Sequence, residues 1–130
     1  MPHNPDIPDA FDVYTLVILR RPADAAEMTD ADLDALQRRH LSYRAELARR
    51  GVLVVNGPFD GQSDDSFRGM SIFACDTAEA ERLTRADPSV VARRLDYEVM
   101  EWWVRADSLA FPLSADGGAP IGDRRSMPDD

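Results

Sequence analysis

One histidine and one aspartate are the residues of this sequence best suited to proton-transfer chemistry. His40 recurs with apolar residues at helical spacing, and Asp87 stands directly before Pro88, where helical geometry is disfavoured. An imidazole titrates near neutral pH, so histidine is the most common general acid or base in proteins. Each residue also has a structural explanation: a core histidine bonded to a backbone carbonyl, and an aspartate that only caps a helix beginning at Pro88.

Six other residues are candidates for binding a small-molecule substrate. Arg44 lies one helical turn after His40, and a guanidinium there, or at Arg93, can hold a carboxylate or phenolate; either arginine can equally lie at the surface. Glycine allows close backbone approach, proline stiffens a strand exit, and an aromatic ring can line a pocket. The full set is Arg44, Gly57, Pro58, Ser71, Arg93 and Trp102. Neither Ser71 nor Cys75 has the sequence context of an activated nucleophile, so covalent catalysis is not expected.

The composition excludes several classes of function. The 24 Asp and Glu residues against 15 arginines give a formal charge of -9, which repels phosphate backbones and anionic lipids. Neither nucleic acid nor a membrane is therefore an expected partner. The chain has no lysine for Schiff-base chemistry, and one cysteine with two histidines makes no convincing metal site. We expect no cofactor, and the absence of a signal-peptide or membrane-span pattern makes the cytoplasm the expected location.

Apolar periodicity predicts a β-α-β-β-α-β order between two tails. Strands are expected over residues 13–19, 52–56, 69–75 and 95–104. Thr29 begins a long helix that ends at Arg50, and the spacing of Asp76 and Glu79 is typical of a capping box that begins a shorter helix. That helix ends near residue 86, and a helical turn restarts at Pro88. Residues 1–10 and 112–130 are expected to be disordered, which leaves 11–111 as the folding unit.

This order of elements is typical of an α+β, ferredoxin-like sheet with both helices on one face. The apolar stripe of the long helix is expected to face the sheet and consists of Leu33, Leu36, His40, Tyr43 and Leu47. The first strand is apolar on both sides, so the face away from the helices would be a large apolar patch. Soluble monomers rarely expose such a patch. A homodimer that buries sheet against sheet is therefore expected.

Short segments along the chain resemble the YciI-like (YCII-related) family of small α+β proteins. They are His40-Leu41 with Gly51 at the helix end, Asn56-Gly57-Pro58-Phe59, Phe67-Arg68-Gly69, Ala78-Glu79-Ala80, Asp87-Pro88-Ser89-Val90 and Tyr97-Glu98-Val99 before Trp102. The resemblance spans about residues 13–104 and implies a dimeric α+β barrel whose active site is built from a histidine and an aspartate, here His40 and Asp87. The sequence departs from the family pattern at residues 92–94, where a glycine is usual.

The resemblance also implies a chemistry. One type of member is a dehydrochlorinase that acts on a chlorinated hydroxyhydroquinone, and muconolactone isomerases share the general fold. We therefore predict a small cofactor-independent lyase or isomerase in which Asp87 orients His40 and His40 moves a proton on a cyclic or aromatic substrate. A non-catalytic, ligand-binding or accessory dimer with the same fold is the alternative. A purely structural dimer, in which His40 and Asp87 never meet, is a third interpretation.

Overall fold

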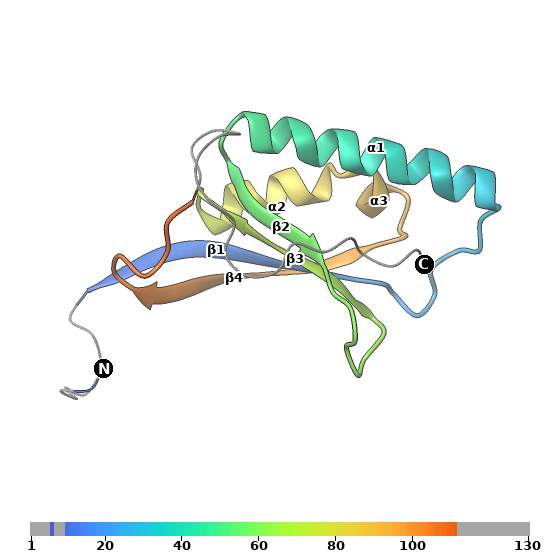
Figure 1. Cartoon of the computed structure of the whole chain (residues 1–130). Coiled ribbons are helices and arrows are strands. Elements are labelled where there is room, and N and C mark those ends of the chain that lie inside the picture. The colour runs from blue at the N-terminus through green and yellow to red at the C-terminus, as the bar shows by residue number, and fades with distance from the viewer. Residues whose placement is uncertain (1–5, 7–9, 112–130) are drawn as a thin grey trace.

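A four-stranded antiparallel sheet with its helices on one face forms the fold (Figure 1). The structure is a computed structural model that describes residue 6 and residues 10–111. Its elements are β1 (Phe11–Arg20), α1 (Asp30–Arg49), β2 (Leu53–Pro58), β3 (Phe67–Phe73), α2 (Thr77–Arg85), α3 (Pro88–Val91) and β4 (Asp96–Arg105). The sheet order is β2-β3-β1-β4, which confirms the expected α+β, ferredoxin-like architecture. The two expected tails lie almost entirely outside the described residues.

The long helix α1 begins and ends where its capping residues predict. The Thr29 hydroxyl accepts a hydrogen bond from the backbone N–H of Asp32 at 3.1 Å, and the acidic residues of the first turn complement the helix dipole. At the other end, Gly51 has a φ of +76°, a left-handed conformation that favours glycine after a helix. Twenty residues of helix therefore lie on one face of the sheet (Figure 1), with His40 near the middle of the helix.

The helical segment between β3 and β4 is broken in two at Asp87 and Pro88. Asp76 caps α2 by accepting from the backbone N–H of Glu79 at 2.8 Å, and α2 ends at its C-cap residue, Ala86. Asp87 then adopts extended geometry, with φ -61° and ψ 130°, and Pro88 begins α3. The break therefore places an aspartate side chain at a sharp junction between two helices.

The expectation that the second strand stops before Gly57 and Pro58 is wrong. Both residues belong to β2 and pair with Met70 and Gly69 of β3. The reason is the position of β2 at the edge of the sheet. A proline has no backbone N–H, and an edge strand tolerates this because one of its sides has no neighbouring strand to accept a hydrogen bond. The β2–β3 hairpin therefore extends further than the apolar pattern indicates.

The two faces of the sheet differ in what covers them. The core lies between the sheet and the helices, and its buried residues are Val17, Leu19, Leu47, Leu53, Phe73, Ala80 and Leu83. Apolar side chains of the opposite face, called the open face here, include Tyr14, Leu16, Ile18, Val55, Met70, Ile72, Met100 and Trp102. Apart from Ile72, these are half-buried or exposed in the single chain, and Phe111 packs edge-on against Tyr14. The first strand is thus apolar on both sides, as expected, but fully buried only beneath the helices.

Close backbone approach makes Gly69 a sensitive position in the β2–β3 pair. A Cβ there would lie 2.7 Å from the carbonyl oxygen of Gly57 and 3.2 Å from the Cα of Pro58. We expect Gly69→Ala to displace the end of β2 and to lower the free energy of unfolding by about 1–3 kcal/mol, measured by urea denaturation. Gly57→Ala is the matched control, because a Cβ at Gly57 meets nothing within 4 Å. Equal stability of the two variants would contradict the prediction.

Candidate active site

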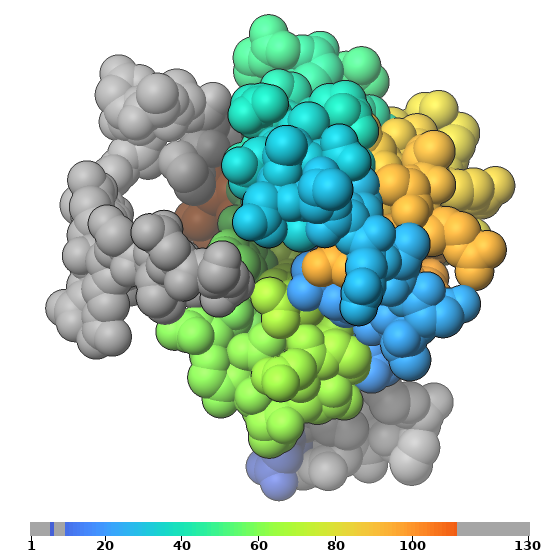
Figure 2. All heavy atoms as spheres, turned by 90° about the vertical axis from the view of Figure 1, so that its right-hand side faces the viewer, coloured from blue at the N-terminus to red at the C-terminus, as the bar shows by residue number. Residues whose placement is uncertain are grey.

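His40 and Asp87 meet between α1 and the junction of α2 with α3. The Nδ1 atom of His40 lies 2.8 Å from Oδ1 of Asp87, although the residues are 47 positions apart in the chain. Figure 2 shows α3 packed against the side of α1, which brings the two segments together. The interpretation in which these side chains never meet is therefore wrong.

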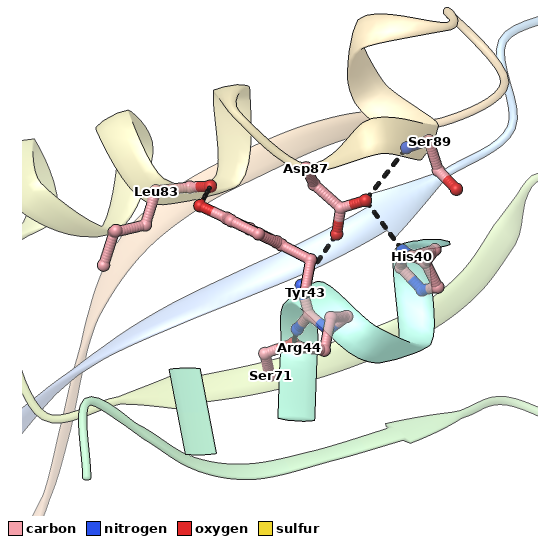
Figure 3. Close-up of polar contacts among 7 residues, drawn as sticks. All are labelled: His40, Tyr43, Arg44, Ser71, Leu83, Asp87 and Ser89. Carbon is pink, nitrogen blue, oxygen red and sulfur yellow. Dashed lines mark hydrogen bonds and ion pairs between the residues drawn. The ribbon is translucent and has the colours of Figure 1, made fainter. Parts of the chain in front are cut away.

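The Asp87 carboxylate is completely buried and has three partners. Its Oδ1 atom accepts from His40 and from the backbone N–H of Ser89 at 2.9 Å, and its Oδ2 atom accepts from Nη1 of Arg44 at 3.4 Å (Figure 3). The contact with Ser89 makes Asp87 the N-cap of α3. The capping role and the contact with histidine were framed as alternatives from the sequence, but the same carboxylate does both.

Arg44 is the member of this cluster that differs most from expectation. Its side chain is 4% exposed, so the alternative interpretation, in which Arg44 lies at the surface, is wrong. The guanidinium reaches Asp87 and also donates to Oγ of Ser71 on β3. Burial lowers the pKa of Arg44, and the neighbouring carboxylate opposes that shift. Arg44 therefore links the sheet to the buried carboxylate, and it brings Ser71 into the same cluster.

Tyr43 fixes the spacing between α1 and α2 beside the cluster. Its hydroxyl donates to the carbonyl oxygen of Leu83, on α2, at 2.7 Å. Burial raises the pKa of Tyr43, and the negative charge of Asp87 raises it further. The hydroxyl therefore stays protonated, and the hydrogen bond holds the end of α2 so that Asp87 faces α1 (Figure 3).

The arrangement leaves one nitrogen of the imidazole available. An ionised carboxylate only accepts hydrogen bonds, so Nδ1 of His40 carries the hydrogen that it donates to Asp87. In a neutral imidazole with this tautomer Nε2 holds a lone pair, and Figure 3 shows this second nitrogen pointing away from Asp87. The His40 side chain is 12% exposed, in contrast to the fully buried carboxylate. The geometry can therefore present a general base at the edge of the core.

The other sequence candidates lie away from His40 and Asp87. Trp102 pairs with Tyr14 on the open face, so the sheet separates its ring from the helices. The Arg93 side chain is 81% exposed and forms an ion pair with Asp24 at 3.6 Å. Gly57 and Pro58 lie on the exposed edge strand β2. None of these four candidates has a hydrogen bond or ion pair with the His40–Asp87 cluster among the contacts of residues 10–111.

The backbone at Arg93 has a conformation that suits the glycine usual in the family pattern at residues 92–94. Its φ is +59°, in the left-handed region that favours glycine and is costly for other residues. A glycine, which the YciI-like pattern usually carries at about residues 92–94, adopts such a conformation without strain. Arg93 therefore occupies a turn position, and its side chain points to the loop that follows β1.

A cavity of about 420 Å³ lies elsewhere, where β1 ends and β4 begins. Its lining residues are Arg20, Arg21, Pro22, Ala23, Ser66, Asp96, Tyr97 and Glu98, and neither His40 nor Asp87 is among them. Within the part of the chain that the structure describes, no three His, Cys, Asp or Glu side chains gather as metal ligands. No helix of that part is long and apolar enough to cross a membrane.

The buried role of Arg44 and the hydrogen bond by which Tyr43 holds α2 were not predicted from the sequence. Both signals were available, because Arg44 follows His40 by four residues and Tyr43 was already placed on the stripe that faces the sheet. A charged residue beside an apolar stripe is usually solvated, which is why the burial of Arg44 was not predicted.

Comparison with known proteins assigns the family. The family model of the YCII-related domain matches residues 14–103, so the chain belongs to the YCII-related family. No curated protein matches the chain in sequence.

One solved structure with a similar fold is 5-chloro-2-hydroxyhydroquinone dehydrochlorinase (TftG) from Burkholderia phenoliruptrix AC1100, in complex with 2,5-dihydroxybenzoquinone. It is 19% identical to this chain, covers 68% of this chain and 92% of its own, and superimposes with a TM-score of 0.51. This similarity confirms the α+β fold.

Proposed function

We propose that this chain is a small cofactor-independent enzyme that transfers a proton on a cyclic or aromatic substrate. In this proposal His40 is the catalytic base and Asp87 holds its tautomer. The observation that carries the proposal is the 2.8 Å contact between Nδ1 and a fully buried carboxylate, with the second ring nitrogen pointing away from that carboxylate (Figure 3). The dehydrochlorinase activity of the structurally similar TftG supports a lyase or isomerase reaction.

The proposed reaction follows from the two nitrogens of the imidazole. Nε2 takes a proton from an acidic O–H or C–H group of the substrate, and the Asp87 carboxylate stabilises the imidazolium that forms. The electron pair left on the substrate becomes a carbon–oxygen or carbon–carbon double bond. In a dehydrochlorination, the new double bond forms as chloride leaves a tetrahedral carbon, that of the keto tautomer in a chlorinated hydroxyhydroquinone, with the electrons of the carbon–chlorine bond, and the imidazolium passes the abstracted proton to water. In an isomerisation, Nε2 returns the proton to another carbon.

A non-catalytic, ligand-binding or accessory dimer is the second candidate. It is favoured by the structural tasks of Asp87, which caps α3 and pairs with buried Arg44 whether or not any substrate is turned over. The two candidates differ in turnover. A binding protein takes up its ligand in stoichiometric amount, whereas an enzyme releases many product molecules per chain.

The test is a screen of chlorinated hydroxyhydroquinones and small unsaturated lactones with the purified chain. Chloride release and quinone absorbance report elimination, and NMR in deuterium oxide reports incorporation of solvent deuterium during isomerisation. We expect catalytic turnover of at least one compound without an added cofactor. Binding of these compounds without chloride release, absorbance change or deuterium incorporation would instead support the ligand-binding candidate.

We further propose that two copies associate through the open face. Three large apolar side chains of that face, Val55, Met100 and Trp102, are 36–41% exposed in the single chain. We expect sedimentation velocity at micromolar concentration to give about twice the chain mass. Met100→Glu should yield monomers, whereas Leu41→Glu, on α1 and also exposed, should remain dimeric. A well-behaved wild-type monomer would contradict the proposal.

A further inference from the structure

Arg44 and His40 face the same buried carboxylate from successive turns of α1. Arg44 Nη1 lies 3.4 Å from Oδ2 of Asp87, and His40 Nδ1 lies 2.8 Å from Oδ1. The exposed fractions of these side chains are 4% for Arg44, 12% for His40 and 0% for Asp87. Water therefore screens the charges of this cluster weakly, and each charge strongly affects the others.

The charge of the cluster depends on His40 alone at neutral pH. A guanidinium keeps its proton in proteins, so Arg44 supplies one fixed positive charge that offsets the carboxylate of Asp87. With a neutral imidazole the three side chains sum to zero. With an imidazolium they carry one uncompensated positive charge in the core, which is unfavourable.

An aspartate–histidine pair without this arginine would behave differently. The buried carboxylate would then be the sole charge, and protonation of the imidazole would neutralise it. The pair would therefore favour imidazolium, which has no lone pair to accept a proton. The positive charge of Arg44 on the other carboxylate oxygen offsets that effect.

We propose that Arg44 is a positioning residue that offsets the charge of Asp87, so that His40 enters the reaction as a neutral base. This inference rests on the proposed function, because it specifies how the same site is kept ready for proton abstraction. It also gives the arginine a role other than substrate binding. The guanidinium is engaged by Asp87 and by Oγ of Ser71, and its side chain is almost fully buried.

The other groups around the cluster do not supply the compensating charge. Ser71 of β3 is uncharged, and the backbone N–H of Ser89 in α3 contributes only a dipole to the carboxylate. Tyr43 of α1 is turned toward α2, where its hydroxyl donates to the carbonyl of Leu83. Within the described part of the chain, Arg44 is thus the arginine of α1 that pairs with Asp87.

The test is an NMR titration of the imidazole Cε1–H signal of His40, which requires no substrate. The only other histidine is His3, and His40→Asn identifies the signal by its loss. We expect Arg44→Met to raise the midpoint of the His40 titration by about one pH unit or more, since charges within about 4–6 Å shift a titration by 1–3 units. Arg39→Met is the control, because it removes an exposed arginine from the position next to His40 and should move the midpoint little.

A second comparison keeps the test decisive if Arg44→Met does not fold. Asp87→Asn leaves Arg44 as an unopposed charge near His40, whereas Asp87→Asn combined with Arg44→Met leaves no charge. The midpoint should therefore be higher in the double variant than in Asp87→Asn. Equal midpoints in that pair, or equal shifts in Arg44→Met and Arg39→Met, would overturn the inference. Failure to find a substrate, with these shifts intact, would overturn the proposed function alone.

Discussion

Asp87→Ala is expected to lower the free energy of unfolding by about 3–5 kcal/mol, because it leaves the guanidinium of Arg44 buried without its counter-ion. The substitution also removes the cap of α3, which adds about 1 kcal/mol. Losses of this size are a large part of the stability of a small domain. Thermal unfolding should show a melting temperature lower by more than about 10 °C.

Two further variants separate the contributions to this loss. Asp87→Asn keeps a capping side chain but removes the charge, so it should remain clearly destabilised. Adding Arg44→Met to Asp87→Asn removes the unpaired cation and should restore part of the lost stability. If Asp87→Asn were within about 0.5 kcal/mol of the wild type, the carboxylate would act only as a helix cap, and its ion pair with Arg44 would contribute nothing.

Loss of the imidazole is expected to have the largest effect on turnover. His40→Asn should reduce the rate of the proton-transfer reaction by about 10²–10⁴-fold, the usual contribution of a positioned general acid or base. The fold should survive, because Asp87 keeps its hydrogen bonds from Arg44 and from the backbone of Ser89. The measurement is chloride release or deuterium incorporation with the substrate that the screen identifies.

Arg39→Asn is the matched control for this prediction. It places the same residue type one position earlier on α1, where the side chain is exposed, and should leave the rate near that of the wild type. Turnover by His40→Asn within a few-fold of the wild type would show that another group moves the proton.

The elements of the fold were largely predictable because their limits are set by local chemistry. Thr29 and Asp76 cap α1 and α2 as expected, and Pro88 begins a new helix because the residue before a proline avoids helical geometry. The end of β2 was not predictable from local residues. Whether Pro58 can remain in a strand depends on whether that strand lies at the edge of the sheet, which is a property of the whole topology.

The candidate site was predictable in its two central residues and not in its connections. His40 was found by its place on an apolar stripe, and Asp87 by the helix break and by the family resemblance. The pairing of Arg44 with Asp87 joins side chains 43 positions apart, and no local pattern indicates that a helix arginine turns inward to meet a carboxylate. Trp102 was predicted to bind substrate, but it lies on the open face of the sheet. A shift of one position along a strand moves a side chain to the other face, and the sequence does not fix that position.

The shared carboxylate has an evolutionary consequence. Asp87 caps a helix and neutralises a buried arginine, so a descendant of this chain without the proposed activity would still be selected to keep the aspartate. The core makes no comparable demand for an imidazole at position 40. Members of the lineage that retain the aspartate but have exchanged the histidine are therefore expected to be folded proteins that have abandoned catalysis. Under the proposed function, position 40 is the residue by which active and inactive descendants are expected to be told apart.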